Sequence, residues 1–185
     1  MPMTNGDDQR QKNERLAAEL RDLFTEAGMT LSAMESCTGG LLADCLTDVP
    51  DCGYFLGGAI AYDAAIKQRF GVPGNLIDSH GVVSPEVAQA MAHSCARWFN
   101  TDAAVSITGV AGPKPQEGCP PGTYFVSVWS TIRGYVVRQG EVDEDRAGVK
   151  LAAAGAALEL LVEEMRAMKG QALDQAPNRT EASIG

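Results

Sequence analysis

The sequence lacks the residue patterns of metal sites, disulfide frameworks and membrane spans. It has 185 residues with only two histidines and five cysteines. The cysteine number is odd and no C-x-x-C pair occurs, which favours reduced thiols over disulfides or a zinc site. No apolar run reaches the roughly 18 residues of a membrane span, and residues 1–12 lack the apolar centre of a secretory signal. We therefore expect a cytoplasmic protein with no membrane partner, no metal and no cofactor.

Positive charge is also scarce. The chain holds 15 lysines and arginines against 24 aspartates and glutamates, a formal net charge of −9. Such an acidic chain repels phosphate backbones at long range, so we expect no nucleic-acid partner. A small anionic ligand is compatible with this charge, because backbone dipoles and one or two arginines act locally.

The length and the apolar content indicate one folded unit. With 45% hydrophobic residues, 185 residues are enough for one well-buried core and short for two. Both ends are polar and without periodicity. We therefore expect a single domain over residues 13–169, with flexible tails at residues 1–12 and 170–185.

Helical and strand patterns alternate along the domain. Periodicity predicts helices near residues 16–27, 41–46, 63–70, 85–100 and 145–169, and strands near 30–34, 55–62, 103–108, 124–130 and 135–138. The last two strands, separated by "TIRG", are expected to form an antiparallel hairpin. The run "FLGGAIAY" at 55–62 is apolar throughout, so we expect that strand to be covered on both faces. The pattern predicts an α/β fold of Rossmann-like, three-layer type: a mixed, largely parallel sheet covered by helices on both faces.

Two turns at strand ends are candidate ligand sites. "ESCTGG" occupies residues 35–40 and "TGVAGP" residues 108–113. In open α/β sheets, ligands collect at the carboxyl ends of strands, where backbone N–H groups point outward. Neither turn matches G-x-x-x-x-G-K-[ST] or G-x-G-x-x-G, which excludes the usual fingerprints for nucleoside triphosphates and dinucleotides. The glycines either shape a tight turn or cradle a small anion.

The first turn holds two rival nucleophiles. Ser36 needs a base, whereas a helix N-terminus would activate the Cys37 thiol directly. The candidate bases are His80, which we place in a loop, His93 within a helix, and Lys67. A lysine with a pKa of about 10.4 must be desolvated to act as a base, and a lowering of about 3 units costs on the order of 4 kcal/mol. Residue spacing leaves these alternatives open.

Five motifs in order resemble one known family. "ESCTGG", "GGAIAYDAAIK", "GVVSPEVAQAMA", "TGVAGP" with the later "PGT", and "DEDRAGVK" are similar to motifs of the C-terminal domain of the competence/damage-inducible protein CinA. The likeness runs from about residue 16 to residue 165. Standalone members of that family are nicotinamide mononucleotide deamidases, also called PncC. They use a serine and a lysine without metal to release ammonia from the carboxamide.

The resemblance implies a role for each matching position. It makes Ser36 the nucleophile and Lys67 its base, and it leaves Cys37 without a catalytic role. The implied catalytic residues are Ser36, Lys67, Tyr62 and Thr108, and the implied substrate-binding residues are Thr38, Gly39, Gly40, Gly109, Ala111, Gly112 and Arg146. Backbone N–H groups of residues 38–40 are candidate donors to the oxyanion, and Tyr62 or Thr108 is expected to assist by hydrogen bonds. Arg146 with the second turn is the candidate phosphate site.

Two departures from the family pattern keep a second function open. Lys114-Pro115-Gln116-Glu117 replaces the usual glycines after "AGP", and "EDR" at 144–146 replaces "GDR". The leading hypothesis is a nicotinamide mononucleotide amidohydrolase of pyridine nucleotide salvage. The alternative is a non-catalytic mononucleotide-binding or interaction paralogue. The resemblance also implies a homo-oligomer such as a dimer.

Overall fold

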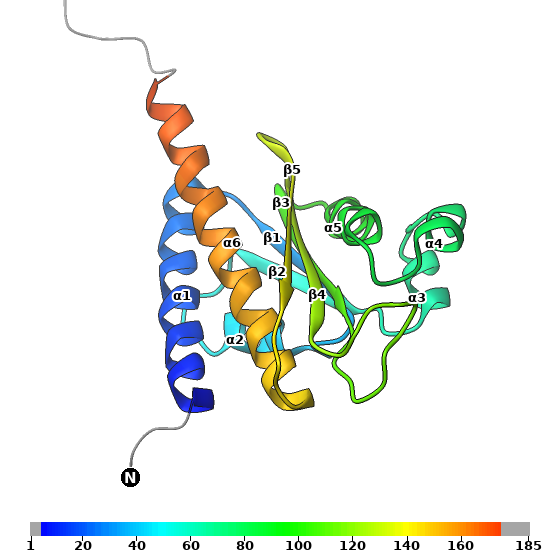
Figure 1. Cartoon of the computed structure of the whole chain (residues 1–185). Coiled ribbons are helices and arrows are strands. Elements are labelled where there is room, and N and C mark those ends of the chain that lie inside the picture. The colour runs from blue at the N-terminus through cyan, green and yellow to red at the C-terminus, as the bar shows by residue number, and fades with distance from the viewer. Residues whose placement is uncertain (1–4, 175–185) are drawn as a thin grey trace, which may run out of the picture.

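The computed structural model of the protein describes residues 5–174, which form one sheet of five strands between two layers of helices (Figure 1). The helices are α1 (Asn5–Ala27), α2 (Leu41–Thr47), α3 (Ala64–Arg69), α4 (Gly74–His80), α5 (Pro85–Phe99) and α6 (Arg146–Asp174). The strands are β1 (Leu31–Glu35), β2 (Phe55–Ile60), β3 (Ala103–Gly109), β4 (Thr123–Ser130) and β5 (Gly134–Glu141). Within these residues, no helix has the length and apolar character needed to cross a membrane.

The sheet is mixed, with strand order β2-β1-β3-β4-β5. Strand β1 lies in the centre of a parallel part and pairs with both β2 and β3. Strands β3, β4 and β5 pair antiparallel, and a short turn joins β4 to β5 as the sequence predicts for a hairpin. The predicted α/β architecture is confirmed, with the parallel pairing confined to the first three strands.

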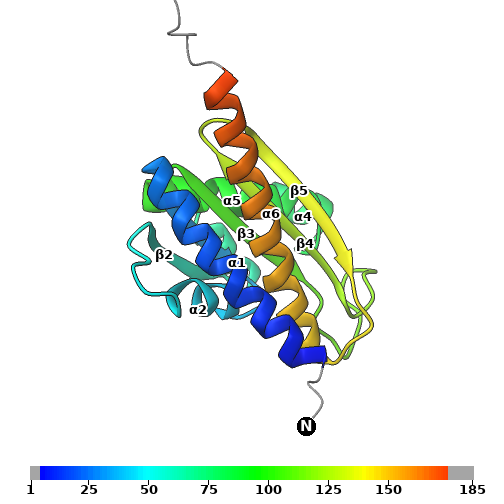
Figure 2. The same cartoon turned by 90° about the vertical axis from the view of Figure 1, so that its left-hand side faces the viewer.

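Helices cover both faces of the sheet, as expected. Figures 1 and 2 show α1, α2 and α6 on one face and α3, α4 and α5 on the other. Successive residues of a strand point to opposite faces, so Val105 and Ile107 of β3 pack in the core under α1 and α6, whereas Ala104 packs toward α5. The parallel strands therefore end at one edge with helices on both sides, which is where the candidate site forms.

The N-terminal helix starts earlier than expected. Helix α1 begins at Asn5, so it includes residues 5–12, which we expected to form a tail. Polar contacts hold this part to α6: Gln9 donates to the Asn13 side chain at 2.8 Å, and the buried Asn13 amide donates to the Leu151 carbonyl at 3.3 Å. Lys12 forms an ion pair with Glu159. Because these contacts are polar, residues 5–12 show no apolar periodicity from which a helix could be predicted. Helix α6 continues to Asp174, and the rest of both predicted tails lies outside the described residues.

Strand β2 is an edge strand, and the prediction that both its faces are covered is wrong. Among the strands of residues 5–174 it pairs only with β1, and exposure alternates along it. Leu56 is 51% exposed and Ile60 is 56% exposed. An apolar run cannot distinguish an edge from a central strand, because pairing is set by the rest of the sheet.

Candidate active site

Ser36 lies at the carboxyl edge of the parallel strands. Its N–H donates to the Ile107 carbonyl of β3 at 2.9 Å, while the Glu35 carbonyl accepts from the Ala61 N–H, just after β2, at 2.8 Å. The backbone is thus held from both sides at the point where β1 ends. Ser36 itself is only 7% exposed. The nucleophile candidate is therefore fixed by strand pairing before the turn begins.

The Glu35 side chain caps helix α2 from inside the protein. Its carboxylate accepts hydrogen bonds from the N–H groups of Gly40 at 3.0 Å, Leu42 at 3.1 Å and Ala43 at 2.9 Å. The first N–H groups of a helix have no intrahelical partner, and a carboxylate there also complements the helix dipole. Glu35 is 2% exposed, so the chain itself supplies the anion at this N-terminus. The sequence analysis did not predict this role of Glu35. The one signal for it in the sequence is the position of an acidic residue five positions before Gly40.

The two glycines of the first turn serve its geometry. The Gly39 N–H donates to the Ser36 carbonyl at 3.1 Å, and the Gly40 N–H is taken by Glu35. Both residues have positive φ, 64° and 101°, which favours glycine. These N–H groups are therefore engaged inside the protein, contrary to the expected role as oxyanion donors. Among residues 5–174, the N–H groups of Cys37 and Thr38 form no hydrogen bond to the backbone of another residue. Thr38 is fully buried and does not line the cleft, whereas Cys37 does, so of these two N–H groups that of Cys37 is placed toward a ligand.

Lys67 projects from α3 into the protein interior, directly behind Ser36. It is fully buried, and its Nζ lies 3.0 Å from Ser36 Oγ. The same nitrogen donates to the Ala61 carbonyl at 2.7 Å and to the Tyr62 carbonyl at 3.3 Å. The helix that carries it is fixed at its start, where the Asp63 side chain accepts from the Ala65 N–H at 2.7 Å. The structure thus brings together two predicted residues that are 31 positions apart.

Burial makes Lys67 a potential base. Desolvation lowers its pKa from 10.5 to about 8, although the negative charges of nearby acidic groups, among them Asp63 and Glu117, oppose the shift. A neutral amine has two N–H bonds and one lone pair. With the two N–H bonds directed at the Ala61 and Tyr62 carbonyls, the lone pair faces Ser36 Oγ. The contacts of Lys67 therefore suit proton transfer from the serine hydroxyl.

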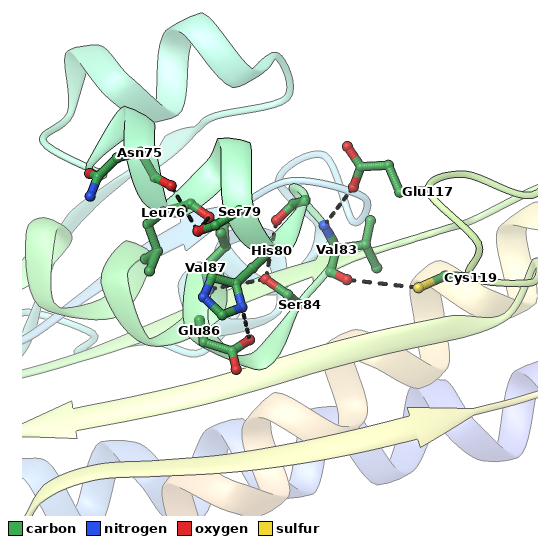
Figure 3. A network of polar contacts seen from close by, with 11 residues as sticks. Asn75, Leu76, Ser79, His80, Val83, Ser84, Glu86, Val87, Glu117 and Cys119 are labelled. Carbon is green, nitrogen blue, oxygen red and sulfur yellow. Dashed lines mark hydrogen bonds and ion pairs between the residues drawn. The ribbon is translucent and has the colours of Figure 1, made fainter.

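The rivals of Ser36 and Lys67 are poorly placed. Burial raises the pKa of the Cys37 thiol to about 12, so it stays protonated at neutral pH. His80 ends helix α4, not a loop as expected, and its Nδ1 lies 3.5 Å from Glu86 (Figure 3). His93 is half-buried between α5 and the sheet, where its ring packs against those of Trp129 on β4 and Tyr135 on β5. Neither histidine contacts Ser36.

A small cleft of about 100 Å³ opens above Ser36. Of the predicted site residues, it is lined by Ser36, Tyr62, Thr108, Gly109, Ala111, Gly112 and Arg146. Lys67 lies behind Ser36, while Thr38, Gly39 and Gly40 form the turn at its side and do not line the cleft. Six further lining residues were not among the predicted site residues: Cys37, Val82, Val83, Val110, Lys114 and Gln116. Within residues 5–174, no group of His, Cys, Asp and Glu side chains is arranged to hold a metal ion.

Arg146 connects two walls of the cleft. It starts helix α6, and its guanidinium donates to the Gly112 carbonyl at 2.8 Å and to the Tyr62 hydroxyl at 2.6 Å. Tyr62 therefore keeps its own proton for donation to a ligand. The Thr108 hydroxyl donates to the Val82 carbonyl at 2.7 Å, so toward a ligand it can only accept. The expected help of Thr108 as a hydrogen-bond donor does not fit this contact.

Comparison with known proteins places this arrangement in a family. The CinA C-terminal domain model matches residues 13–165. A putative competence-damage inducible protein of Desulforamulus reducens is 33% identical over 150 residues, which are 80% of this chain and 36% of the relative. A CinA-like protein of Mycobacterium sp. (strain MCS) is 42% identical over 138 residues, 73% of this chain and 33% of the relative. This chain spans about a third of the length of these curated relatives.

Solved structures agree with this match. The competence/damage inducible protein CihA of Agrobacterium tumefaciens superimposes with a TM-score of 0.79 at 29% identity, covering 82% of this chain and 94% of that one. A CinA superfamily protein of Klebsiella pneumoniae superimposes with a TM-score of 0.80 at 26% identity, covering 84% and 98%. The resemblance found in the sequence motifs is confirmed.

Proposed function

The chain belongs to the CinA C-terminal domain family, and from this premise we propose that it hydrolyses the carboxamide of nicotinamide mononucleotide to nicotinic acid mononucleotide and ammonia. The names of the matched relatives specify no reaction, so the proposal rests on the site. The observation that carries it is the 3.0 Å contact between a fully buried lysine amine and the Ser36 hydroxyl at the base of a cleft.

The first step forms an acyl-enzyme. Lys67, in its neutral form, takes the proton of Ser36 as Oγ attacks the carboxamide carbon and the carbonyl π bond opens to an oxyanion. The N–H of Cys37 and the hydroxyl of Tyr62, which both belong to residues that line the cleft, are the donors available to that charge. The Lys67 ammonium then gives its proton to the amide nitrogen, the C–N bond breaks, and ammonia leaves.

The second step releases the acid. Water attacks the ester on Ser36 while Lys67, neutral again, takes a proton from the water. The tetrahedral intermediate collapses, the ammonium returns that proton to Ser36 Oγ, and the product leaves as the carboxylic acid, which loses its remaining proton to solvent water. The two carbonyls that hold the Lys67 amine keep it in place throughout both steps.

The remaining cleft residues suit the other parts of the substrate. Val82, Val83 and Val110 give an apolar wall on which a pyridine ring can pack. Arg146 and the backbone of residues 109–112 form the polar end, where a guanidinium can bind phosphate oxygens. The carboxamide then lies toward Ser36 and the phosphate toward the start of α6.

The alternative function is mononucleotide binding without hydrolysis. One feature favours it: the loop at residues 114–117 carries bulky side chains into the cleft region where relatives of the motif have glycines. Such a loop can still admit a ligand yet hold its carboxamide away from Ser36. The two functions differ in turnover, not in binding.

The test is ammonia release from nicotinamide mononucleotide by the full chain. We expect turnover by the natural protein, loss of at least about 1,000-fold in Ser36→Ala and in Lys67→Met, and retention of most turnover in Cys37→Ala, the matched control next to the nucleophile. Full turnover by Ser36→Ala would refute the assignment. Calorimetric binding of the mononucleotide without ammonia release by the natural protein would instead establish the alternative.

A further inference from the structure

The loop between β3 and β4 brings a lysine into the cleft. Lys114 and Gln116 line it together with Arg146, Gly112 and Ser36. These two side chains belong to the segment that differs from the glycine-rich pattern of the family. The segment therefore changes the chemistry of the cleft and not only its flexibility.

The loop is held in place by contacts at its tip. Gln116 and Cys119 exchange backbone hydrogen bonds at 3.1 and 2.9 Å. The Glu117 carboxylate accepts from the Val83 N–H at 3.2 Å, and Cys119 Sγ lies 3.7 Å from the Val83 carbonyl (Figure 3). A Cβ at Gly81 would lie 2.5 Å from a Glu117 carboxylate oxygen, so the glycine makes room for this contact. The loop is thus fixed to the segment before α5, and Lys114 projects from an ordered support.

Two cations line the cleft without a carboxylate partner. The guanidinium of Arg146 binds only neutral acceptors, the Gly112 carbonyl and the Tyr62 hydroxyl. Among the residues that the structure describes, no acidic side chain forms an ion pair with Lys114, and Glu117 from the same loop is held at Val83. Elsewhere in the described residues, six cations are paired with acids, namely Lys12, Arg21, Arg133, Arg138, Arg166 and Lys169. Other cations in this part of the chain also form no ion pair, so what distinguishes Lys114 and Arg146 is that they line the same cleft.

Two such cations suit a ligand with two negative charges. A phosphate monoester carries about −1.5 to −2 at pH 7 and offers three acceptor oxygens. One cation alone leaves part of that charge uncompensated in a chain whose net charge is −9. A second cation on the loop also discriminates strongly against the same amide without its phosphate, because the nucleoside gives Lys114 no partner.

We propose that Lys114 is a specificity-determining residue that joins Arg146 in a two-cation subsite for a dianionic phosphate monoester, and so makes this chain select the phosphorylated amide over its nucleoside. This inference rests on the proposed function, because it assigns the phosphate of the same substrate. It concerns the residue that replaces a glycine of the family pattern, and it therefore applies to this chain and not to the family.

The test separates binding from chemistry. Three proteins are compared, all carrying Ser36→Ala so that no ligand is hydrolysed: one with the natural Lys114, one with Lys114→Ala and one with Lys114→Arg. Calorimetry measures the affinity of each for nicotinamide mononucleotide and for nicotinamide riboside. We expect Lys114→Ala to weaken mononucleotide binding about 10- to 30-fold, with riboside binding unchanged and Lys114→Arg within about threefold of the parent. Lys169→Ala, which removes the same charge from the distant end of α6, is the control and should change neither affinity.

Each outcome decides between the two proposals. If Lys114→Ala loses affinity for the mononucleotide and not for the riboside, the subsite is supported. That conclusion holds even if the natural chain releases no ammonia, in which case only the hydrolytic function fails. Equal mononucleotide affinity with and without Lys114, in a chain that does release ammonia, overturns the subsite alone. Absence of mononucleotide binding by the Ser36→Ala protein together with absence of ammonia release by the natural chain overturns both.

Discussion

Replacing Lys67 by methionine tests whether the amine beside Ser36 is held in a desolvated site. Methionine keeps the length and the apolar stem of lysine but cannot carry charge. The variant should lose activity, but its stability is the more informative measurement, because it depends on the buried amine and not on any assumed substrate. The relevant quantity is the pH dependence of the free energy of unfolding, compared between variant and natural protein.

The pKa of Lys67 sets the size of the effect. Burial lowers it from 10.5 to about 8, so between these pH values the unfolded chain binds a proton that the folded protein does not. The free energy of unfolding of the natural protein therefore rises with pH across that interval, by about 3 kcal/mol in total. The methionine variant lacks this contribution. The free energy of unfolding of the variant minus that of the natural protein should therefore be larger at pH 7 than at pH 10.5, by about 3 kcal/mol.

Comparing the two proteins at two pH values cancels those effects of the substitution that do not depend on pH. Methionine also loses the hydrogen bonds of Lys67 to Ala61, Tyr62 and Ser36, but that loss applies at both pH values and cancels in the difference. Urea unfolding of both proteins, followed by circular dichroism at several pH values from 7 to 10.5, gives the quantity directly. A difference that stays constant within about 0.5 kcal/mol over this range would refute a desolvated amine.

Three further predictions follow from the site. Because the neutral amine of Lys67 is the active form, kcat/KM for nicotinamide mononucleotide should rise about tenfold per pH unit below its pKa of about 8 and level off above, and a flat profile of initial rates from pH 6 to 9.5 would contradict this role. Glu35→Gln removes the charge that accepts three N–H groups, so we expect stability to fall by roughly 2 kcal/mol and kcat to fall about 10- to 100-fold with KM nearly constant. The control in the same kinetic and unfolding assays is Asp44→Asn, because Asp44 is an exposed acid in the first turn of α2, the helix that Glu35 caps. Equal kcat values for the two variants would show that Glu35 does not position Ser36. Burial raises the pKa of Cys37 to about 12, so a maleimide at pH 7 should leave this thiol unlabelled in the folded protein by mass spectrometry, and rapid labelling with loss of activity would reopen the thiol as nucleophile.

Local sequence patterns were enough for several elements. Ser84 before Pro85 predicts the start of α5, and in the structure the Ser84 hydroxyl accepts from the Val87 N–H at 3.3 Å. The helix ends at Asn100, which adopts the left-handed conformation at its C-cap. The β4–β5 hairpin was predicted in the same way. These predictions hold because caps, turns and periodicity depend on residues that are close in the chain.

Predictions that depended on distant contacts were less successful. The exposure of β2 depends on which strands pair with it, and the early start of α1 depends on α6, which lies far along the chain. The two glycines of the first turn were ambiguous between a tight turn and an anion cradle. The structure resolves this, because Glu35 and the Ser36 carbonyl already take their N–H groups.

For the site, the sequence by itself determined which residue types are present, where strands give way to turns, and, through its motifs, the family. It could not determine that Lys67 loses its water or that its amine reaches Ser36. Both depend on how α3 packs under the ends of β1 and β2, where the two atoms come to lie 3.0 Å apart in a fully buried setting. Desolvation and distance are properties of the assembled layers, and for that reason only the tertiary structure decided them.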